Sequence, residues 1–187
     1  MPVPITPAHI RATIDAYAGL HPKEKPGLEF ALRLLDEGAD LTDRTEYRGH
    51  ATATAVLIGP TGKVLFIHHR ALSRWLMPGG HVEPQDGTLL TAALRELAEE
   101  TGIRPESVVP LGSSPLQIEV HAIPADEAKG ERGHRHIDFR YLFRTAAEVA
   151  ALQAEEVTGA AWRHVRALGH RRLRRRMAEG VRRAGSG

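Results

Sequence analysis

The sequence contains no cysteine, and this absence excludes several chemistries at once. Without thiols the chain can have no disulfide scaffold, no thiolate zinc site and no cysteine nucleophile. No apolar run is long enough to span a bilayer, and the first five residues, MPVPI, lack the basic and apolar regions of a secretory signal. We therefore expect a cytoplasmic protein that makes no use of a membrane.

The composition is otherwise ordinary for a globular protein. With 187 residues, the chain is long enough for one substantial domain with a single core. Hydrophobic residues make up 42% and charged residues 26%. The net charge is only +2 but the sequence pI is about 9.2, because arginines crowd into the last quarter of the chain.

The first 47 residues predict a helical extension. A threonine–proline pair at positions 6 and 7 is typical of a helix start, and a second helical pattern runs from Pro26 to about Gly38. Residues 38–48 are polar and rich in turn formers, which indicates a linker. The expected apolar stripes are Ile10, Ile14 and Tyr17 in the first helix, and Leu28, Ala31, Leu32 and Leu35 in the second.

The remaining residues, 48–187, predict a second domain that mixes strands and helices. The sequence GPTG at 59–62 separates two apolar, β-branched segments and predicts a hairpin. Pro78-Gly79-Gly80 is expected to form a tight turn. Strands are expected at 51–58, 63–69, 116–122, 137–143 and 159–164, and helices at 88–101 and 165–183.

Three glutamates carry the chemical signal. Glu96, Glu99 and Glu100 stand at i, i+3 and i+4, so a helix projects their carboxylates from one face. Like charges at this spacing are each unfavourable by about 0.2–0.5 kcal/mol, and a hard divalent cation such as Mg²⁺ would compensate. Arg95, four residues before Glu99, can hold that side chain in place. The alternative is a solvated acidic face.

The wider context resembles the Nudix box, G-x5-E-x7-R-E-U-x-E-E-x-G-U, where U is a bulky aliphatic residue. Gly80 matches its first glycine, and RELAEETGI at 95–103 matches its whole second half. Two departures occur in the first half: Asp86 stands where the box has its early glutamate, and eight residues instead of seven separate it from Arg95. The role of this acid therefore stays open, and Glu83 is an alternative for it.

This resemblance implies an α/β fold, a Nudix-type α/β/α sandwich with a mixed sheet. The helices of residues 1–47 would be an N-terminal extension, and residues 48–187 would be the Nudix domain with its C-terminal helix. It also implies hydrolysis of a pyrophosphate bond in a nucleoside diphosphate-linked substrate with Mg²⁺ or Mn²⁺. Carried over by position, Glu96, Glu99 and Glu100 would bind metal, and the Gly80 carbonyl would add a ligand. The metal would neutralise phosphate oxygens and lower the pKa of the attacking water.

The general base is either a box glutamate, Glu96 or Glu99, or an acid elsewhere. Asp138 is our first candidate outside the box, and it shares a strand face with His136, which we assign to substrate binding. The alternative is that this face of the strand is exposed. Glu155 and Glu156 are a weaker option. Arg70 ends a strand before the box, and its guanidinium could bind a phosphate through two parallel hydrogen bonds. The alternative is an ordinary exposed strand end.

Several functional alternatives remain beside a hydrolase of small nucleotide-like substrates. A non-catalytic nucleotide-sensing domain often lacks box glutamates, whereas this chain keeps all three and has no evident helix-turn-helix. A second alternative is an isopentenyl diphosphate isomerase, which shares this fold. Its site resembles one that depends on cysteine, and this chain has no cysteine. Hydrolysis of RNA 5′ ends or caps is supported only by the basic run HRRLRRR at 170–176, which lacks aromatic residues for stacking. The N-terminal helices could also form a homodimer contact.

Overall fold

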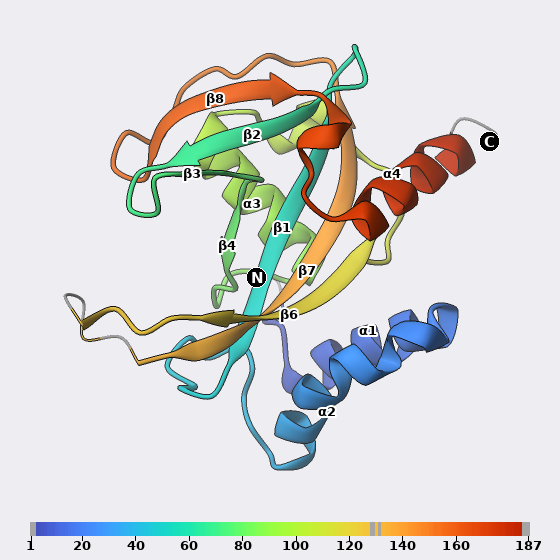
Figure 1. Ribbon diagram of the computed structural model, residues 1–187, viewed down its shortest axis with the longest axis vertical. Coiled ribbons are helices and arrows are strands. Elements are labelled where there is room, and N and C mark those ends of the chain that lie inside the picture. The colour runs from blue at the N-terminus through green and yellow to red at the C-terminus, as the bar shows by residue number, and fades with distance from the viewer. Residues whose placement is uncertain (1–2, 128–129, 131, 185–187) are drawn as a thin grey trace. The chain divides into compact units, whose positions relative to one another are not determined.

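The computed structural model describes residues 3–127, 130 and 132–184 (Figure 1). The chain divides into two compact units. The first unit comprises Met1–Ala53, His81–Ala92 and Ile118–Phe139, and the second comprises Thr54–Gly80, Ala93–Gln117 and Arg140–Gly187. Four α-helices are described: α1 (Pro7–Leu20), α2 (Glu29–Asp36), α3 (Leu89–Thr101) and α4 (Arg171–Ala184). The strands are β1 (His50–Ile58), β2 (Val64–His69), β3 (Arg74–Leu76), β4 (Gly79–His81), β5 (Val108–Pro110), β6 (Gln117–Ile123), β7 (His134–Thr145) and β8 (Val157–Arg163).

The N-terminal helix α1 begins as the sequence predicts. Thr6 caps it, because its hydroxyl accepts a hydrogen bond from the His9 N–H at 3.2 Å, and proline occupies the first turn. The predicted stripe is confirmed, since Ile10, Ile14 and Tyr17 are all buried.

The second helix differs in detail from the expectation. A 3₁₀ segment, Pro22–Leu28, precedes α2 and contains Pro26. In α2 the buried residues are Ala31 and Leu34, whereas Leu32 and Leu35 are only half-buried. The predicted C-terminal glycine is confirmed, because Gly38 has a φ of +79°, a conformation that glycine adopts without strain.

The strands form one eight-stranded sheet in which the order β3-β2-β1-β7-β5 is joined by β4 on β1, β6 on β7 and β8 on β2. The predicted hairpin is confirmed: β1 and β2 are antiparallel, with Ile58 opposite Val64. Strand β8 also runs antiparallel along β2, as Figure 1 shows. The predicted mixed sheet with flanking helices is confirmed as a fold class.

The expectation of a tight turn at Pro78-Gly79-Gly80 is wrong. Gly79–His81 form the extended strand β4, and neither glycine has a positive φ. Two further short strands, β3 and β5, were not expected, because three-residue segments carry too little periodicity to be recognised.

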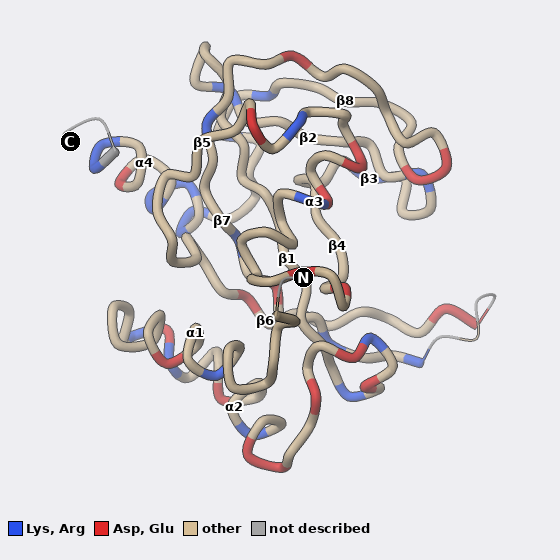
Figure 2. The backbone as a smooth tube through the Cα atoms, turned by 180° about the vertical axis from the view of Figure 1, so that it is seen from behind, with Lys and Arg blue, Asp and Glu red and all other residues tan. Residues whose placement is uncertain are grey.

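Helix α4 closes a core in the second unit. As predicted from their spacing, Leu168, Leu173 and Met177 are buried, and they pack with apolar residues of the sheet. Burial of each such side chain contributes about 1.5–3 kcal/mol. Helix α4 is rich in arginine, and its arginine positions are blue in Figure 2. Within the described part of the chain, no helix combines the length and apolar character needed to cross a membrane.

Candidate metal platform

Helix α3 supplies the three predicted carboxylates of the second unit. Leu97 on the same helix is fully buried, and Gly102, with a φ of +67°, ends the helix just after them. The carboxylates are graded in exposure: Glu100 is only 2% exposed, and the side chains of Glu96 and Glu99 are 13% and 48% exposed. The acidic face is therefore not a solvated surface, and that alternative is wrong for Glu96 and Glu100.

Burial makes the charged forms of two of these glutamates costly. It is the main cause that raises the pKa of Glu100 to about 8, and the neighbouring carboxylates of Glu96, Glu156 and Glu99 raise it further. Burial likewise raises the pKa of Glu96 to about 7, although Arg95 opposes the shift. A site that concentrates buried negative charge in this way favours a bound cation.

Arg95 lies between two of the carboxylates. Its Nη1 donates hydrogen bonds to Glu96 Oε1 at 3.0 Å and to Glu99 Oε2 at 2.9 Å. The arginine side chain itself is only 14% exposed. It therefore fixes the orientation of both carboxylates and offsets part of their charge.

The two glycines of β4 contact the glutamates in different ways. A Cβ added to Gly80 would lie 2.6 Å from both Cδ and Oε1 of Glu96, so a larger residue there would displace the Glu96 carboxylate. The Gly79 N–H donates to Glu100 Oε2 at 3.0 Å. Glu96 at Gly80 and Glu100 at the Gly79 N–H thus offer carboxylate oxygens beside β4, and oxygen ligands suit a hard divalent cation such as Mg²⁺.

Arg70 holds a segment beside this platform. Its backbone N–H donates to the Glu156 carbonyl, and its Nη2 donates to the Ala154 carbonyl, both at 2.7 Å. The Gln153 N–H donates to the Glu100 carbonyl at 3.4 Å, and the charge of Glu156 raises the pKa of Glu96 and Glu100. Glu156 is therefore a neighbour of the platform. From the sequence alone Glu156 is a weaker candidate for the general base than Asp138. Its position directly before a strand is the one signal that could have raised it.

Asp138 and the early acids of the box belong to the first unit. Asp138 is only 5% exposed and accepts a hydrogen bond from the Thr52 hydroxyl at 3.3 Å, so the exposed-strand alternative is wrong for it. Asp86 is buried, and its Oδ2 accepts from the Glu83 N–H at 2.8 Å while its own N–H donates to the Glu83 carbonyl at 2.9 Å. Asp86 therefore fixes the turn between residues 83 and 86, and the Glu83 side chain is exposed.

His136, the predicted substrate-binding residue, lies in a group of histidine rings. Its ring centroid is 5.0 Å from that of His50 and 5.2 Å from that of His81. The three rings come from segments far apart in the chain, so nothing in the local sequence indicates that they are neighbours.

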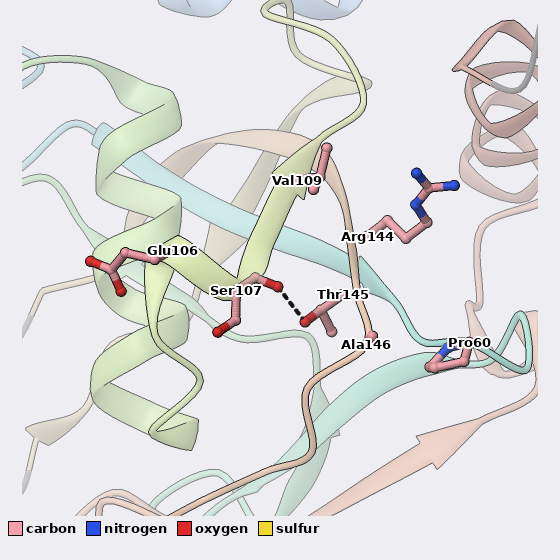
Figure 3. Close-up of a pocket in the computed structure, with 7 residues that line it drawn as sticks. All are labelled: Pro60, Glu106, Ser107, Val109, Arg144, Thr145 and Ala146. Atoms are coloured by element: carbon pink, nitrogen blue, oxygen red, sulfur yellow. Dashed lines mark hydrogen bonds between the residues drawn. The ribbon is translucent and has the colours of Figure 1, made fainter.

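A separate pocket in the second unit contains none of the predicted site residues (Figure 3). One of its walls is tied by a hydrogen bond from the Thr145 hydroxyl to the Ser107 carbonyl, at 2.6 Å. Its lining offers a single carboxylate and a single guanidinium, so it does not resemble a metal site. The residues that line it are Pro60, Glu106, Ser107, Val109, Arg144, Thr145 and Ala146.

Three carboxylates on one helix, an arginine that orients two of them and two glycines beside them make this the candidate metal platform. The family model of the NUDIX domain matches residues 48–184, and the chain belongs to this family.

Three relatives illustrate the likeness. The "Probable DHNTP pyrophosphohydrolase" of Lactococcus lactis is 36% identical over 100 residues, 54% of this chain and 57% of the relative. The "m7GpppN-mRNA hydrolase NUDT17" of Xenopus laevis is 34% identical over 115 residues, 58% of this chain and 38% of the relative. This chain therefore matches less than two thirds of the length of either protein. Among solved structures, an Ap4A hydrolase of C. elegans has a TM-score of 0.52 at 18% identity, covering 71% of this chain and 97% of that one. This likeness supports the fold alone.

Proposed function

We propose that the chain hydrolyses a pyrophosphate bond in a nucleoside diphosphate-linked substrate, with Mg²⁺ as its cofactor and Mn²⁺ as a substitute. The observation that carries this proposal is the pair of buried carboxylates, Glu96 and Glu100, whose pKa values burial raises to about 7 and 8. A bound cation would offset the free-energy cost of ionising these two carboxyl groups. The names of the relatives, a pyrophosphohydrolase and an mRNA cap hydrolase, agree with this reaction class.

Each residue of the platform has a distinct role in the proposed mechanism. Glu96, Glu99 and Glu100 would hold the cation, with the Gly80 carbonyl as a further ligand. When bound, the cation would neutralise phosphate oxygens and make the attacking water more acidic. Arg95 would keep Glu96 and Glu99 oriented, since it already donates to both carboxylates. Asp86 and Glu83 would support the box from the turn that they form.

The general base is proposed among four carboxylates. Glu99 and Glu96 are the candidates within the box, and Asp138 is the first candidate outside it. Glu156 joins them because its charge acts on both buried glutamates of the platform. Replacing the general base by its amide should lower kcat by about 10²–10⁴-fold, and the acidic limb of the pH profile should disappear. Comparing Asp138→Asn with Glu156→Gln therefore separates the two acids outside the box.

Substrate contacts are proposed for Arg70 and His136. Arg70 already donates to a backbone carbonyl, so it would reach a phosphate with its remaining N–H groups. His136 would contact the substrate through its ring. Replacement of either residue should raise KM more than it lowers kcat.

A substrate screen with Mg²⁺ tests the reaction. Nucleotides, nucleotide sugars, dinucleoside polyphosphates and capped RNA would be incubated with the protein, and phosphate or pyrophosphate release would be scored. The Glu99→Gln/Glu100→Gln double variant should lose the activity, whereas Glu106→Gln, which changes an exposed glutamate of the same unit, should keep it. Full activity in the double variant would refute the mechanism. Inactivity of well-folded wild type across the panel would favour a nucleotide-sensing domain instead.

Capped or triphosphorylated RNA is the second candidate substrate. The similarity to a cap hydrolase and the arginines of α4 favour it. Basic contacts to a phosphate backbone weaken steeply as salt rises. If RNA is the substrate, its KM should increase with salt and should increase again when Arg171 and Arg175 are replaced by glutamine, while KM for a mononucleotide should stay unchanged.

Several sequence-based expectations stay predictions. They include the division at residues 47 and 48, the cytoplasmic location and a homodimer contact through the N-terminal helices. Gel filtration of the full chain and of a chain that starts at residue 48 would test the division and the dimer contact together.

A further inference from the structure

Five histidine rings of the first unit lie against one another. His50 begins β1, His81 ends β4, His121 lies on β6, and His134 and His136 lie on β7. The centroids of neighbouring rings are 4.9–5.7 Å apart. Nearly half of the 11 histidines in the chain are thus gathered in one place, and four separate strands bring them there.

The ring nitrogens of three of these residues converge on a point. One ring nitrogen each from His50, His81 and His136 lies within 4.8 Å of the other two, and Nε2 of His50 is 3.1 Å from Nε2 of His81. In a tetrahedral zinc site with bonds of 2.0–2.1 Å, neighbouring ligand nitrogens are about 3.3 Å apart. The closest pair therefore already has the spacing of two ligands that share one ion.

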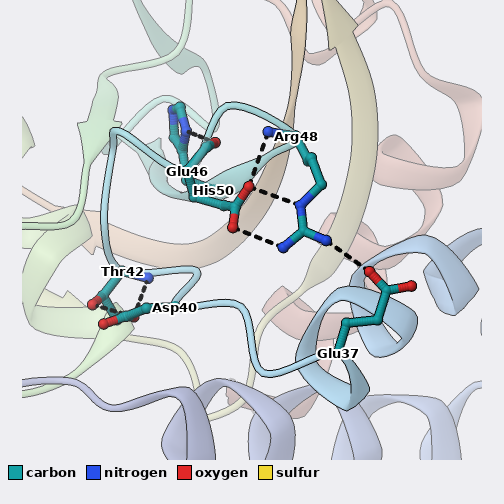
Figure 4. Close-up of polar contacts among 6 residues, drawn as sticks. All are labelled: Glu37, Asp40, Thr42, Glu46, Arg48 and His50. Carbon is teal, nitrogen blue, oxygen red and sulfur yellow. Dashed lines mark hydrogen bonds and ion pairs between the residues drawn. The ribbon is translucent and has the colours of Figure 1, made fainter.

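The orientation of His50 matches that of a metal ligand. Its Nδ1 faces the Glu46 carbonyl at 3.4 Å (Figure 4), and because a carbonyl can only accept, the proton belongs on Nδ1. This leaves a lone pair on Nε2, which points at His81. Glu46 is itself held by Arg48, which donates to both of its carboxylate oxygens at 2.9 Å. Metal-binding histidines are commonly oriented by such a bond from the other ring nitrogen.

His134 repeats the arrangement. Its Nδ1 donates to the Arg132 carbonyl at 2.8 Å, and its Nε2 lies 3.2 Å from Nε2 of His136. Next to them, Nδ1 of His121 is buried without a hydrogen-bond partner. Backbone carbonyls thus orient the rings of His50 and His134, and the Nε2 atoms of these rings face His81 and His136.

His50 is buried and the rings of His81 and His136 are half-buried, and a neutral imidazole is the form that binds metals. Burial is the main cause that lowers the pKa of His136 to about 3 and that of His81 to about 4, and it also lowers the pKa of His50. Arg44 adds a repulsive charge at His50 and His81, and Asp43 opposes it at His50.

We propose that His50, His81 and His136 bind one divalent transition-metal ion, with Zn²⁺ preferred. Imidazole nitrogens suit Zn²⁺, Co²⁺, Ni²⁺ and Cu²⁺, whereas Mg²⁺ takes oxygen ligands. The site is therefore chemically distinct from the glutamate platform, and an ion bound there would take the place of the substrate contact proposed for the His136 ring. An ion held there would fasten β1, β4 and β7 to one another.

Metal binding can be measured without any substrate. The Glu99→Gln/Glu100→Gln variant disables the carboxylate platform, and in this background the protein should retain about one equivalent of Zn²⁺ after desalting. Co²⁺ should give the intense visible absorption of a tetrahedral nitrogen site, and Zn²⁺ should abolish it. Adding His81→Asn or His136→Asn should weaken Zn²⁺ binding about 100-fold or more. His170→Asn, which changes an exposed histidine of the second unit, should leave binding unchanged.

Two results would overturn the proposal. In the first, the protein with all its histidines retains no more Zn²⁺ than the His81→Asn/His136→Asn variant. In the second, the Co²⁺ absorption persists in that variant. Because these histidines are packed together, the folding of each variant would be checked by circular dichroism. As a second measurement, ¹⁵N spectra of the histidine rings in the unmutated protein should show Zn²⁺ shifting nitrogens of His50, His81 and His136. Unshifted rings would refute the site even if the variants failed to fold.

Discussion

Glu100→Gln should make the metal-free protein more stable at alkaline pH. The carboxyl of Glu100 has a pKa of about 8 in the folded chain, mainly because it is buried, against an ordinary value of 4.5. Between these two values the folded chain binds more protons than the unfolded chain, so stability falls as the pH rises through this window. Glutamine keeps the shape and can still accept from the Gly79 N–H, but it has no proton to lose.

The size of the effect follows from the two pKa values. From about pH 5 to pH 8, ionisation of Glu100 should cost the folded state about 3 kcal/mol more than the unfolded state. For a chain of this length, that corresponds to a difference of about 6–12 °C in Tm. At pH 5 the wild type and the variant should be close in stability, and at pH 8 the variant should be clearly more stable.

Urea unfolding in a chelator, followed by circular dichroism across this pH range, measures the difference directly. Glu106→Gln, at an exposed site of the same unit, is the matched control and should show no such slope. Added Mg²⁺ at pH 8 should stabilise the wild type and have much less effect on Glu100→Gln, because binding to the folded state alone raises stability. A stability difference that stays constant from pH 5 to 8 would refute the reasoning.

Three further predictions concern the platform and the core. Gly80→Ala would place a Cβ 2.6 Å from the Glu96 carboxylate and displace it, so the Mg²⁺ concentration for half-maximal activity should rise at least about tenfold. An unchanged Mg²⁺ titration would show that the position of this carboxylate beside Gly80 does not matter for metal binding. Arg95→Gln would remove the cation that opposes the raised pKa of Glu96, so the pKa should rise above about 7 and the pH profile of activity should shift upwards, with the largest loss near neutral pH. An unshifted profile would show that Arg95 does not tune Glu96. Leu173→Ala should destabilise the chain by about 2–5 kcal/mol in urea, because Leu173 is fully buried in the core that α4 closes; a loss below about 1 kcal/mol would mean that α4 contributes little to that core.

Local features of the chain were predictable because they depend on neighbours in sequence. The cap at Thr6, the glycine after α3 and the hairpin between β1 and β2 all follow from residues within a few positions of one another. The wrong turn prediction has a tertiary cause. Pro78-Gly79-Gly80 has the composition of a turn, but neither glycine has a positive φ, and Gly80 instead lets the Glu96 side chain approach β4 closely.

The glutamate cluster and the histidine cluster differ in the same respect. Helical spacing alone puts Glu96, Glu99 and Glu100 on one face, so the sequence by itself was enough to predict a metal platform. It could not determine how deeply each carboxylate is buried, and the packing decides which of their pKa values are raised. His50 and His136 are 86 residues apart in the chain. Only the pairing of distant strands brings such residues together, because nothing in the local sequence specifies which strand segments become neighbours.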